Sequence, residues 1–118
     1  MSDAHTISVE DTAQRIRVRV NGEEVADTRR ARVLFEAGLK PRYYLPREDV
    51  RMEALSEVEG KHTTCPYKGV AGYYSAAGAD SIAWTYPQAR DDSHPIEGYV
   101  CFYEDRPEVS LEIDGVVL

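Results

Sequence analysis

The sequence predicts a small domain of mainly antiparallel β-strands, arranged as bent sheets or a partly open barrel, with one short helix near residues 47–55. Two observations favour this fold class. Short runs alternate apolar and polar residues, which is the pattern of a strand with one buried face. Glycine, proline and Asn-Gly turn signals separate these runs. A chain of 118 residues with 42% hydrophobic residues can bury one modest core, so we expect a single domain over residues 1–118.

The strongest local signal is in residues 15–20, where arginine alternates with isoleucine or valine. This period of two predicts a strand that buries its apolar face. Asn21-Gly22 follows directly, and this dipeptide readily adopts the positive φ angles of a type I′ turn. We therefore predict a hairpin that returns through residues 24–27.

The next elements are weaker. Residues 31–36 place Ala31, Val33 and Phe35 on one face if they are extended, although a short helix is a competing interpretation. Residues 42–45 are rich in tyrosine and predict a strand that Pro46 ends. Because proline suits the first turn of a helix, we expect one or two helical turns across residues 47–55.

Beyond Gly60 the pattern is again that of strands. We expect five of them, at residues 61–65, 70–75, 81–86, 98–103 and 109–113, with glycines and prolines between them. Residues 88–95 form the most polar internal stretch and are predicted to be an exposed loop. Many short strands with frequent turns are typical of sandwiches, barrels and bent sheets.

Charge and hydropathy argue against two classes of partner. Fourteen basic and 21 acidic residues give a formal net charge of −7, which opposes nonspecific attraction to nucleic acid or anionic lipid. No apolar run is long enough to cross a bilayer, and the polar start lacks the pattern of a signal peptide. We therefore expect a cytoplasmic protein. Most of the arginines fall in the first half, which keeps a local anion site open as a hypothesis.

Two groups of side chains could carry chemistry. The cysteines are only two, Cys65 and Cys101, and in a reducing compartment we expect both to be packed thiols. The eight tyrosines all lie between Tyr43 and Tyr103. On an extended strand Tyr99, Cys101 and Tyr103 share one face and Val100 the other, so one face is a candidate core and the other a candidate pocket wall.

The aromatic residues predict either a hydrogen-bonded core or a ligand cavity, because buried tryptophan and tyrosine need partners for their polar ends. Arginine recognises carboxylate and phosphate through two parallel hydrogen bonds. An aromatic pocket with cations at its mouth would suit a small anionic or aromatic ligand. The candidate ligand-binding residues are Arg42, Tyr44, Arg47, Cys65, Tyr67, Lys68, Trp84, Tyr86, Tyr99 and Tyr103.

Candidates for catalysis are Cys65, Tyr67 and Lys68, which place a thiol, a phenol and an ammonium around one turn. A nucleophilic cysteine would need a neighbour that lowers its pKa. His62 and Cys65 have a spacing that zinc sites use, and His94 with Cys101 could complete four ligands, but that second pair lacks the tight spacing of structural zinc sites. We expect no metal and no cofactor, and the sequence leaves open whether the protein is an enzyme.

Four segments in order give the sequence a resemblance to a known family. They are residues 43–50, 64–69, 83–87 and 96–103, of which the second reads Thr-Cys-Pro-Tyr-Lys-Gly. Together with a weaker match at the Asn21-Gly22 hairpin, they resemble the family catalogued as domain of unknown function 427, which is also labelled nucleotidyltransferase-like. The resemblance implies a compact, mainly β fold with bent sheets, similar to Mss4-like domains, without the paired C-x-x-C zinc motifs that many Mss4-like domains carry.

The nucleotidyltransferase label finds no support in the residues. Metal-dependent nucleotidyl transfer needs carboxylates that converge on divalent ions. Asp91-Asp92 and Glu104-Asp105 are adjacent pairs, and neighbours on an extended chain point in opposite directions.

Three functional hypotheses follow. The first is a small-molecule-binding domain with a Tyr/Trp-lined pocket and Arg/Lys at its mouth. The second is a small enzyme that uses the thiol, phenol and ammonium of residues 65–68. The third is a protein-interaction module, for which a homodimer formed through an exposed strand edge is the simplest case.

Overall fold

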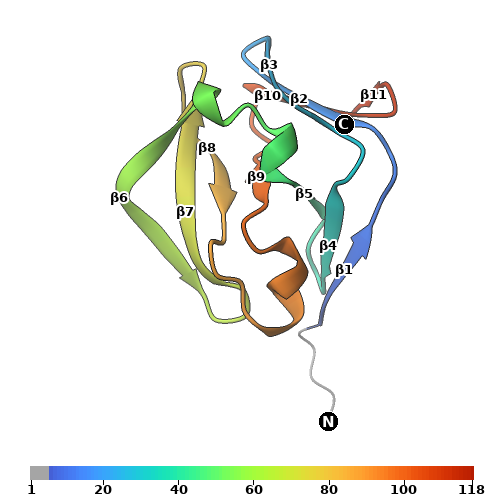
Figure 1. The fold of residues 1–118 in the computed structure, drawn as a ribbon, viewed down its shortest axis with the longest axis vertical. Helices are drawn as coiled ribbons and strands as arrows, with labels where there is room; N and C mark the ends of the chain where they lie inside the picture. Colours follow the sequence, from blue (N-terminus) through green and yellow to red (C-terminus); the bar gives the residue numbers. More distant parts are fainter. Residues whose placement is uncertain (1–5) are drawn as a thin grey trace.

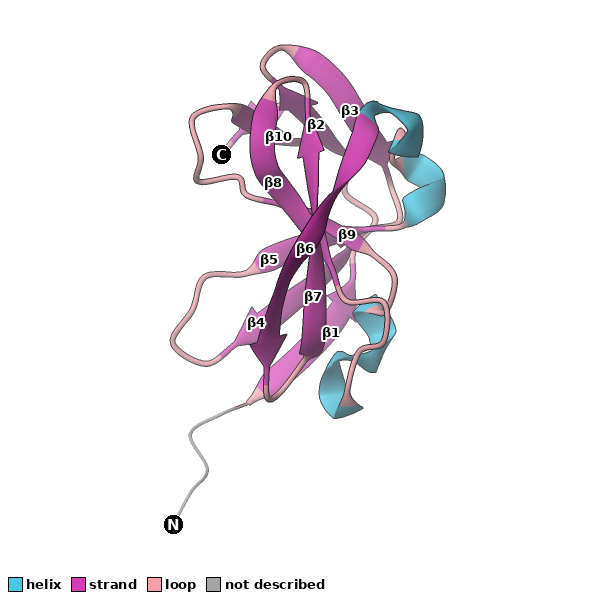
Figure 2. Ribbon diagram, turned by 90° about the vertical axis from the view of Figure 1, so that its left-hand side faces the viewer, coloured by secondary structure: helices cyan, strands magenta, loops and turns pink. Residues whose placement is uncertain are grey.

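A computed structural model describes residues 6–118, and its strands form two antiparallel sheets, as the sequence predicts. The larger sheet has seven strands in the order β1-β4-β5-β9-β8-β7-β6, and the smaller has four in the order β11-β10-β2-β3. Figure 1 shows β6, β7 and β8 on one side and β4 with β1 on the other. Figure 2 shows the smaller sheet at one end of the molecule.

The strands are short except for β6. The seven-stranded sheet contains β1 (Ile7–Asp11), β4 (Arg32–Glu36), β5 (Arg42–Leu45), β6 (Leu55–Cys65), β7 (Gly69–Ala76), β8 (Ala79–Thr85) and β9 (Val100–Phe102). The four-stranded sheet contains β2 (Ile16–Val20), β3 (Glu23–Thr28), β10 (Val109–Ile113) and β11 (Val116–Val117).

The hairpin of β2 and β3 confirms the strongest prediction. Asn21 and Gly22 have φ angles of 49° and 83°, so both adopt the left-handed conformation that a type I′ turn requires. The strands pair from Val20↔Glu23 to Ile16↔Thr28. The apolar residues of β2 are buried and its arginines are half-buried, as alternation demands.

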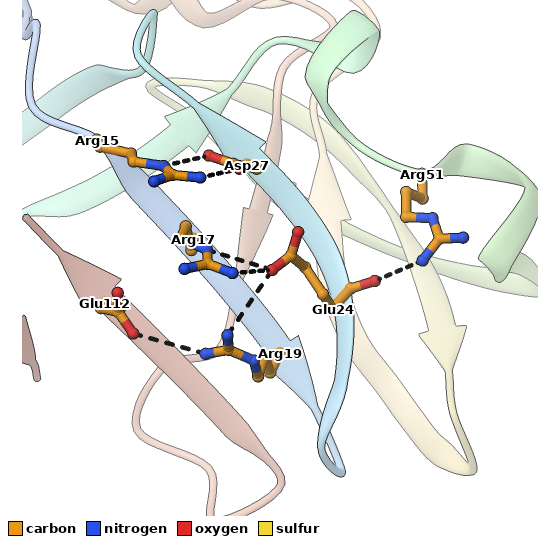
Figure 3. A network of polar contacts seen from close by, with 7 residues as sticks. All are labelled: Arg15, Arg17, Arg19, Glu24, Asp27, Arg51 and Glu112. Carbon is orange, nitrogen blue, oxygen red and sulfur yellow. Dashed lines mark hydrogen bonds and ion pairs between the residues drawn. The ribbon is translucent and has the colours of Figure 1, made fainter. Parts of the chain in front are cut away.

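The arginines of this hairpin point away from the core and face carboxylates (Figure 3). Arg15 contacts Asp27 with an N···O distance of 2.7 Å, and Arg17 contacts Glu24 at 2.6 Å. Arg19 lies between Glu24 and the Glu112 carboxylate of β10, at 3.8 and 3.5 Å. These arginines of the first half therefore neutralise acidic side chains of neighbouring strands.

The short strand β9 separates two clusters of apolar side chains. Val100 and Phe102 belong to the cluster between the two sheets, which is mostly aliphatic and includes the apolar face of β2. Cys101 points to the opposite face and belongs to the second cluster, with Tyr44 and Trp84. This is the alternation that the sequence predicts for residues 99–103.

Among residues 6–118, helical structure is limited to 3-10 turns. Where the sequence predicts a short helix, the chain forms two such turns, η1 (Arg47–Asp49) and η2 (Met52–Ala54). None of the helices within residues 6–118 is long and apolar enough to cross a membrane.

The structure decides one local alternative and corrects one local expectation. Residues 32–36 form a strand and not a short helix, and Phe35 stands on the same side of it as Val33 but is 38% exposed, whereas Ala31 and Val33 are buried. The polar stretch 88–95 is not simply an exposed loop, because a 3-10 turn, η3 (Asp91–Ile96), buries Ser93. The Ser93 hydroxyl donates to the carbonyl of Arg90 at 2.6 Å, and this bond satisfies the buried side chain.

Candidate functional site

The register of the larger sheet aligns four side chains across four strands. Tyr44 of β5 is paired with Cys101 of β9, Cys101 with Trp84 of β8, and Trp84 with Tyr73 of β7. Residues that are directly opposite in an antiparallel sheet lie on the same face, with Cβ atoms about 5 Å apart. Three aromatic rings and one thiol therefore form a row on the face of the sheet that the smaller sheet does not cover.

A cavity of about 270 Å³ lies against this row. Its lining comes from β4, β5, β7 and β8, from residues that follow β4, β8 and β9, and from the turn between β6 and β7. We call it the aromatic cavity, and its lining consists of Leu34, Glu36, Leu39, Lys40, Arg42, Tyr44, Lys68, Tyr73, Trp84, Tyr86 and Tyr103.

Trp84 is held in place by two aromatic neighbours. Its indole Nε1 donates a hydrogen bond to the Tyr44 hydroxyl at 3.2 Å, and the two rings meet edge to face with centroids 6.2 Å apart. The Tyr103 ring lies 4.3 Å from the indole, tilted by 47°. Both distances lie near the range that aromatic pairs favour. The contacts fix the orientation of the indole in the cavity wall.

Arg42 brings a cation next to the indole. Its guanidinium carbon lies 5.3 Å from the centroid of the Trp84 ring, within the range of a cation–π contact. The Asp105 carboxylate is 3.5 Å from Nη1 and forms an ion pair with it. Nevertheless Nη1 is buried and has no hydrogen-bond partner among residues 6–118. Buried donors are nearly always hydrogen-bonded, so this guanidinium has capacity for another acceptor.

Two lysines complete the charges of the cavity. The Lys68 ammonium contacts the Glu36 carboxylate at 2.5 Å, and both side chains are largely buried. Lys40 is half exposed, and its ammonium lies 3.8 Å from the Glu104 carboxylate. Burial raises the pKa of Glu104 above its ordinary value, an effect that the nearby Lys40 and Arg42 oppose. Each of the three cations in the lining thus has a carboxylate beside it.

Three phenols in the lining, those of Tyr44, Tyr86 and Tyr103, stay protonated at neutral pH. Desolvation raises the pKa values of Tyr44 and Tyr86 well above the ordinary value of 10. Burial also raises the pKa of Tyr103 to about 12, with a further contribution from the neighbouring Tyr73. Burial likewise raises the pKa of the Cys101 thiol strongly. The cavity therefore offers neutral hydroxyl groups that can both donate and accept hydrogen bonds.

Six of the ten side chains that the sequence nominates as ligand contacts line this cavity. They are Arg42, Tyr44, Lys68, Trp84, Tyr86 and Tyr103. Tyr99 and Cys65 pack at the edge of the same aromatic cluster but outside the lining. Arg47 belongs to the other face, where it donates to the Tyr74 hydroxyl at 3.0 Å. Tyr67 is 47% exposed in the turn after β6.

Of the three catalytic candidates, only Lys68 lines the cavity, so the structure does not gather Cys65, Tyr67 and Lys68 around it. Within residues 6–118, no three or more His, Cys, Asp or Glu side chains are placed so that they could hold a metal ion. His62 lines a larger groove of about 870 Å³ at the bulge of β6, and His94 lies beside Glu97.

Five lining residues were missed by reasoning on the sequence. They are Leu34, Glu36, Leu39, Lys40 and Tyr73. Four of them belong to β4 and the loop after it. These residues are far from β8 in the sequence and come close to it only when the sheet has formed. Tyr73 had a usable signal, because in the pair Tyr73-Tyr74 the two rings must point to opposite faces of a strand.

The comparison with known families agrees with the resemblance noted in the sequence. The family described as Domain of unknown function (DUF427) matches residues 8–115. No curated protein matches the chain.

Proposed function

We propose a ligand-binding role for this chain, which belongs to the DUF427 family. In this proposal the aromatic cavity binds a small planar molecule that carries an anionic or strongly polar oxygen. The family description assigns no activity, so the proposal depends on the side chains of the cavity. The ring of the ligand lies against the aromatic wall, and its oxygen accepts a hydrogen bond from Arg42.

The single observation that carries this proposal is the state of the Arg42 guanidinium. Its Nη1 is buried without a hydrogen-bond partner among the described residues, beside the face of the only tryptophan in the chain. The Asp105 carboxylate, 3.5 Å from Nη1, balances its charge without a hydrogen bond of normal length. A ligand oxygen that approaches the guanidinium more closely would supply that hydrogen bond, so the site gains from binding as well as from burial of the ring.

The size of the cavity restricts the ligand. A volume of about 270 Å³ corresponds to roughly nine water molecules at ~30 Å³ each. That is near the lower end of the range for small-molecule pockets. It suits a ligand of one or two fused rings and is too small for a complete nucleoside triphosphate.

The chain provides its own reporter for a test. Because Trp84 is the only tryptophan, its emission reports on the cavity wall without background from other indoles. We expect a saturable change in Trp84 fluorescence with aromatic carboxylates such as salicylate or nicotinate. The same ligands should raise the melting temperature, because a ligand that binds only the folded state stabilises it.

Two arginines form a matched pair for the control. Arg42 stands beside Trp84 in the cavity, and Arg47 lies near Tyr74 on the opposite face, 6.0 Å from its ring centroid. We expect R42M to weaken binding at least about tenfold, as loss of a charged hydrogen bond implies, and R47M to leave it unchanged. Equal effects of the two variants, or no ligand that changes Trp84 emission, would contradict the proposal.

The enzyme hypothesis has less support. A reactive centre made from residues 65–68 would need the thiol of Cys65 in contact with the same space as Lys68, and only the lysine lines the cavity. We therefore propose binding, without a covalent step, as the function of this site.

A further inference from the structure

The groove beside the bulge of β6 is a second hollow of the molecule. It has a volume of about 870 Å³ and is lined by the middle of β6, by β7, by the end of β8 and by residues 87–90. The pairs Glu57↔Tyr74 and His62↔Gly72 leave residues 58–61 of β6 opposite a single residue of β7. Figure 1 shows β6 bending away from β7 in its middle. We call this hollow the β6 groove.

Gly72 gives the floor of the β6 groove an open position. Seven of the eight glycines in the chain have a positive φ angle, and Gly72 is the exception. A β-carbon added at Gly72 would meet no atom within 4 Å, its chain neighbours aside. Neither the backbone conformation nor packing within the described chain therefore requires a glycine here. A glycine inside a strand weakens it and often marks the close approach of a ligand or another backbone.

Thr85 lies beside Gly72 with a hydroxyl that lacks a partner. Gly72 is paired with His62 on one side and with Thr85 on the other. Residues aligned in this way share a face of the sheet, so the missing side chain of Gly72 leaves a gap between the imidazole and the hydroxyl. Thr85 is only 4% exposed, and its Oγ1 has no hydrogen-bond partner among residues 6–118. Buried hydroxyls are nearly always paired, so this one has capacity for a bond to a ligand.

The rim of the β6 groove carries four ionisable side chains that have no hydrogen bond or ion pair within the described part of the chain. They are Glu57, Glu59, His62 and Arg90. Their order follows β7. Glu57 stands opposite Tyr74, whereas Arg90 lies next to Gly69, with its Cγ 3.7 Å from the position of a β-carbon there. One end of the groove is therefore acidic and the other basic.

We infer that the β6 groove binds an extended segment of a partner protein, about five residues long, with a basic side chain at one end and an acidic side chain at the other. Residues 69–74 of β7 cover about 17 Å at ~3.3 Å per residue, which is the length of such a segment. A single ring would not reach both charged ends. The inference does not depend on the function proposed for the aromatic cavity.

Each part of the segment has a counterpart in the groove. Its basic side chain meets Glu57 and Glu59, and its carboxylate meets Arg90. Between the two ends, a backbone N–H or C=O reaches the Thr85 hydroxyl, which can accept or donate. The absent side chain of Gly72 lets the backbone come that close. The opposite charges at the two ends also exclude partners, because a like charge at either end is repelled.

Three peptides of equal length test the charge pattern. Acetyl-Lys-Val-Thr-Val-Glu-amide carries both charges, and its two relatives carry lysine at both ends or glutamate at both ends. Isotope-edited NMR titration measures their affinities, and shifts of the Gly60 and Gly72 amides place the binding in the groove. We expect the mixed-charge peptide to bind at least about tenfold more tightly than either relative, because each relative meets repulsion at one end.

Substitutions at Gly72 test the open position. Gly72→Ala puts a methyl group where no contact exists, so the melting temperature should stay the same or rise. Gly72→Val fills more of the gap with a side chain that suits a strand. Affinity for the mixed-charge peptide should fall from glycine to alanine and again from alanine to valine.

Thr85→Val separates binding from stability. It removes an unpaired buried hydroxyl, so the melting temperature should not fall, whereas affinity for the mixed-charge peptide should drop by about fivefold. A purely structural role of Thr85 would not produce this combination. Thr63→Val serves as the control, because the Thr63 hydroxyl contacts that of Tyr73 and Thr63 lies outside the groove lining.

The results divide cleanly. Preferred binding of the mixed-charge peptide that weakens in the Gly72 and Thr85 variants, and survives in Thr63→Val, supports the inference. Tightest binding by the two-lysine peptide would indicate general attraction to a chain of net charge −7 and would overturn it. Equal binding of the three peptides, no binding by any of them, or full affinity in Gly72→Val would overturn it as well.

Discussion

The two faces of the seven-stranded sheet differ in both composition and packing. The face toward the smaller sheet presents Val100 and Phe102 and is covered by the aliphatic side chains of β2, β3 and β10. The other face gathers tyrosines, Trp84 and Cys101, and the aromatic cavity opens there. Aliphatic side chains fill space without directional needs, whereas aromatic rings with polar ends need partners and leave gaps. The strand β9 therefore contributes Val100 and Phe102 to a packed core and Cys101 to the face that carries the candidate binding site.

The largest effect on stability is expected when a side chain on the face toward the smaller sheet is truncated. Phe102 is fully buried, so Phe102→Ala should lower the free energy of unfolding by about 3–5 kcal/mol. The chain contains one other phenylalanine, Phe35, which is 38% exposed and provides the control. Urea titration should show a much smaller loss for Phe35→Ala. Similar losses of stability for both variants would mean that the face toward the smaller sheet is not the more tightly packed of the two.

A smaller effect is expected on the aromatic face. Tyr44→Phe removes the acceptor of the Trp84 indole N–H and leaves that donor buried, which should cost about 1–3 kcal/mol. Tyr73→Phe removes a hydroxyl that contacts Thr63 at 2.6 Å in an exposed position, so it should cost less. Chemical denaturation followed by circular dichroism measures both. A larger loss for Tyr73→Phe would contradict the role given to the Tyr44–Trp84 bond.

The charges beside the cavity predict a dependence on pH. Because burial raises the pKa of Glu104 above 4.5, the folded state keeps this proton longer than the unfolded state. The associated stability is present below pH 4.5 and is lost as the pH rises through the raised pKa. Glu104→Gln should therefore flatten the decline in stability above pH 4.5.

Asp49 provides a control of opposite sign for the Glu104 prediction. Its pKa is lowered below 3.8, mainly by the hydrogen bond from Thr28 and then by Arg30. Its contribution is present above pH 3.8 and is lost as the pH falls through the lowered pKa. Asp49→Asn should thus lose stability at neutral pH. Urea midpoints between pH 3 and pH 7 would measure both variants, and a steeper decline in Glu104→Gln would show the sign to be wrong.

The smallest perturbation compares the two thiols without any substitution. Cys101 is fully buried with a raised pKa, and Cys65 is partly exposed at the end of β6. Iodoacetamide should modify Cys65 in the folded protein and reach Cys101 only after unfolding, because the thiolate is the reactive form. Peptide mapping by mass spectrometry identifies the modified residue. Rapid modification of Cys101 would show that the aromatic face opens readily.

The fold was largely predictable because its signals are local. Alternation in residues 15–20 and the Asn21-Gly22 turn define a hairpin without reference to the rest of the chain. The helix predicted near residues 47–55 became two 3-10 turns, since Val50 lies between them and forms a bridge with Ala26 of β3. Contact with another strand decided a segment that local propensity left undetermined.

The candidate cavity was predictable only in part, because its lining depends on which strands become neighbours. Alternation placed Tyr99, Cys101 and Tyr103 on one face of a strand without any structure. No local pattern could place Glu36 beside Lys68, since β4 and the β6–β7 turn meet through the curvature of the sheet. Arg47 shows the opposite case: proximity to Tyr44 in sequence suggested a shared site, yet the turn after Pro46 directs it to the other face.

The pairing of each cation in the cavity with a carboxylate has a consequence for the kinetics of binding. With these local charges balanced, an approaching anion experiences mainly the surplus of seven negative charges on the whole chain. Salt weakens that long-range repulsion, since the screening length is only about 8 Å at physiological ionic strength. Added salt should accordingly speed the association of an aromatic carboxylate and leave the association of an uncharged ring unaltered.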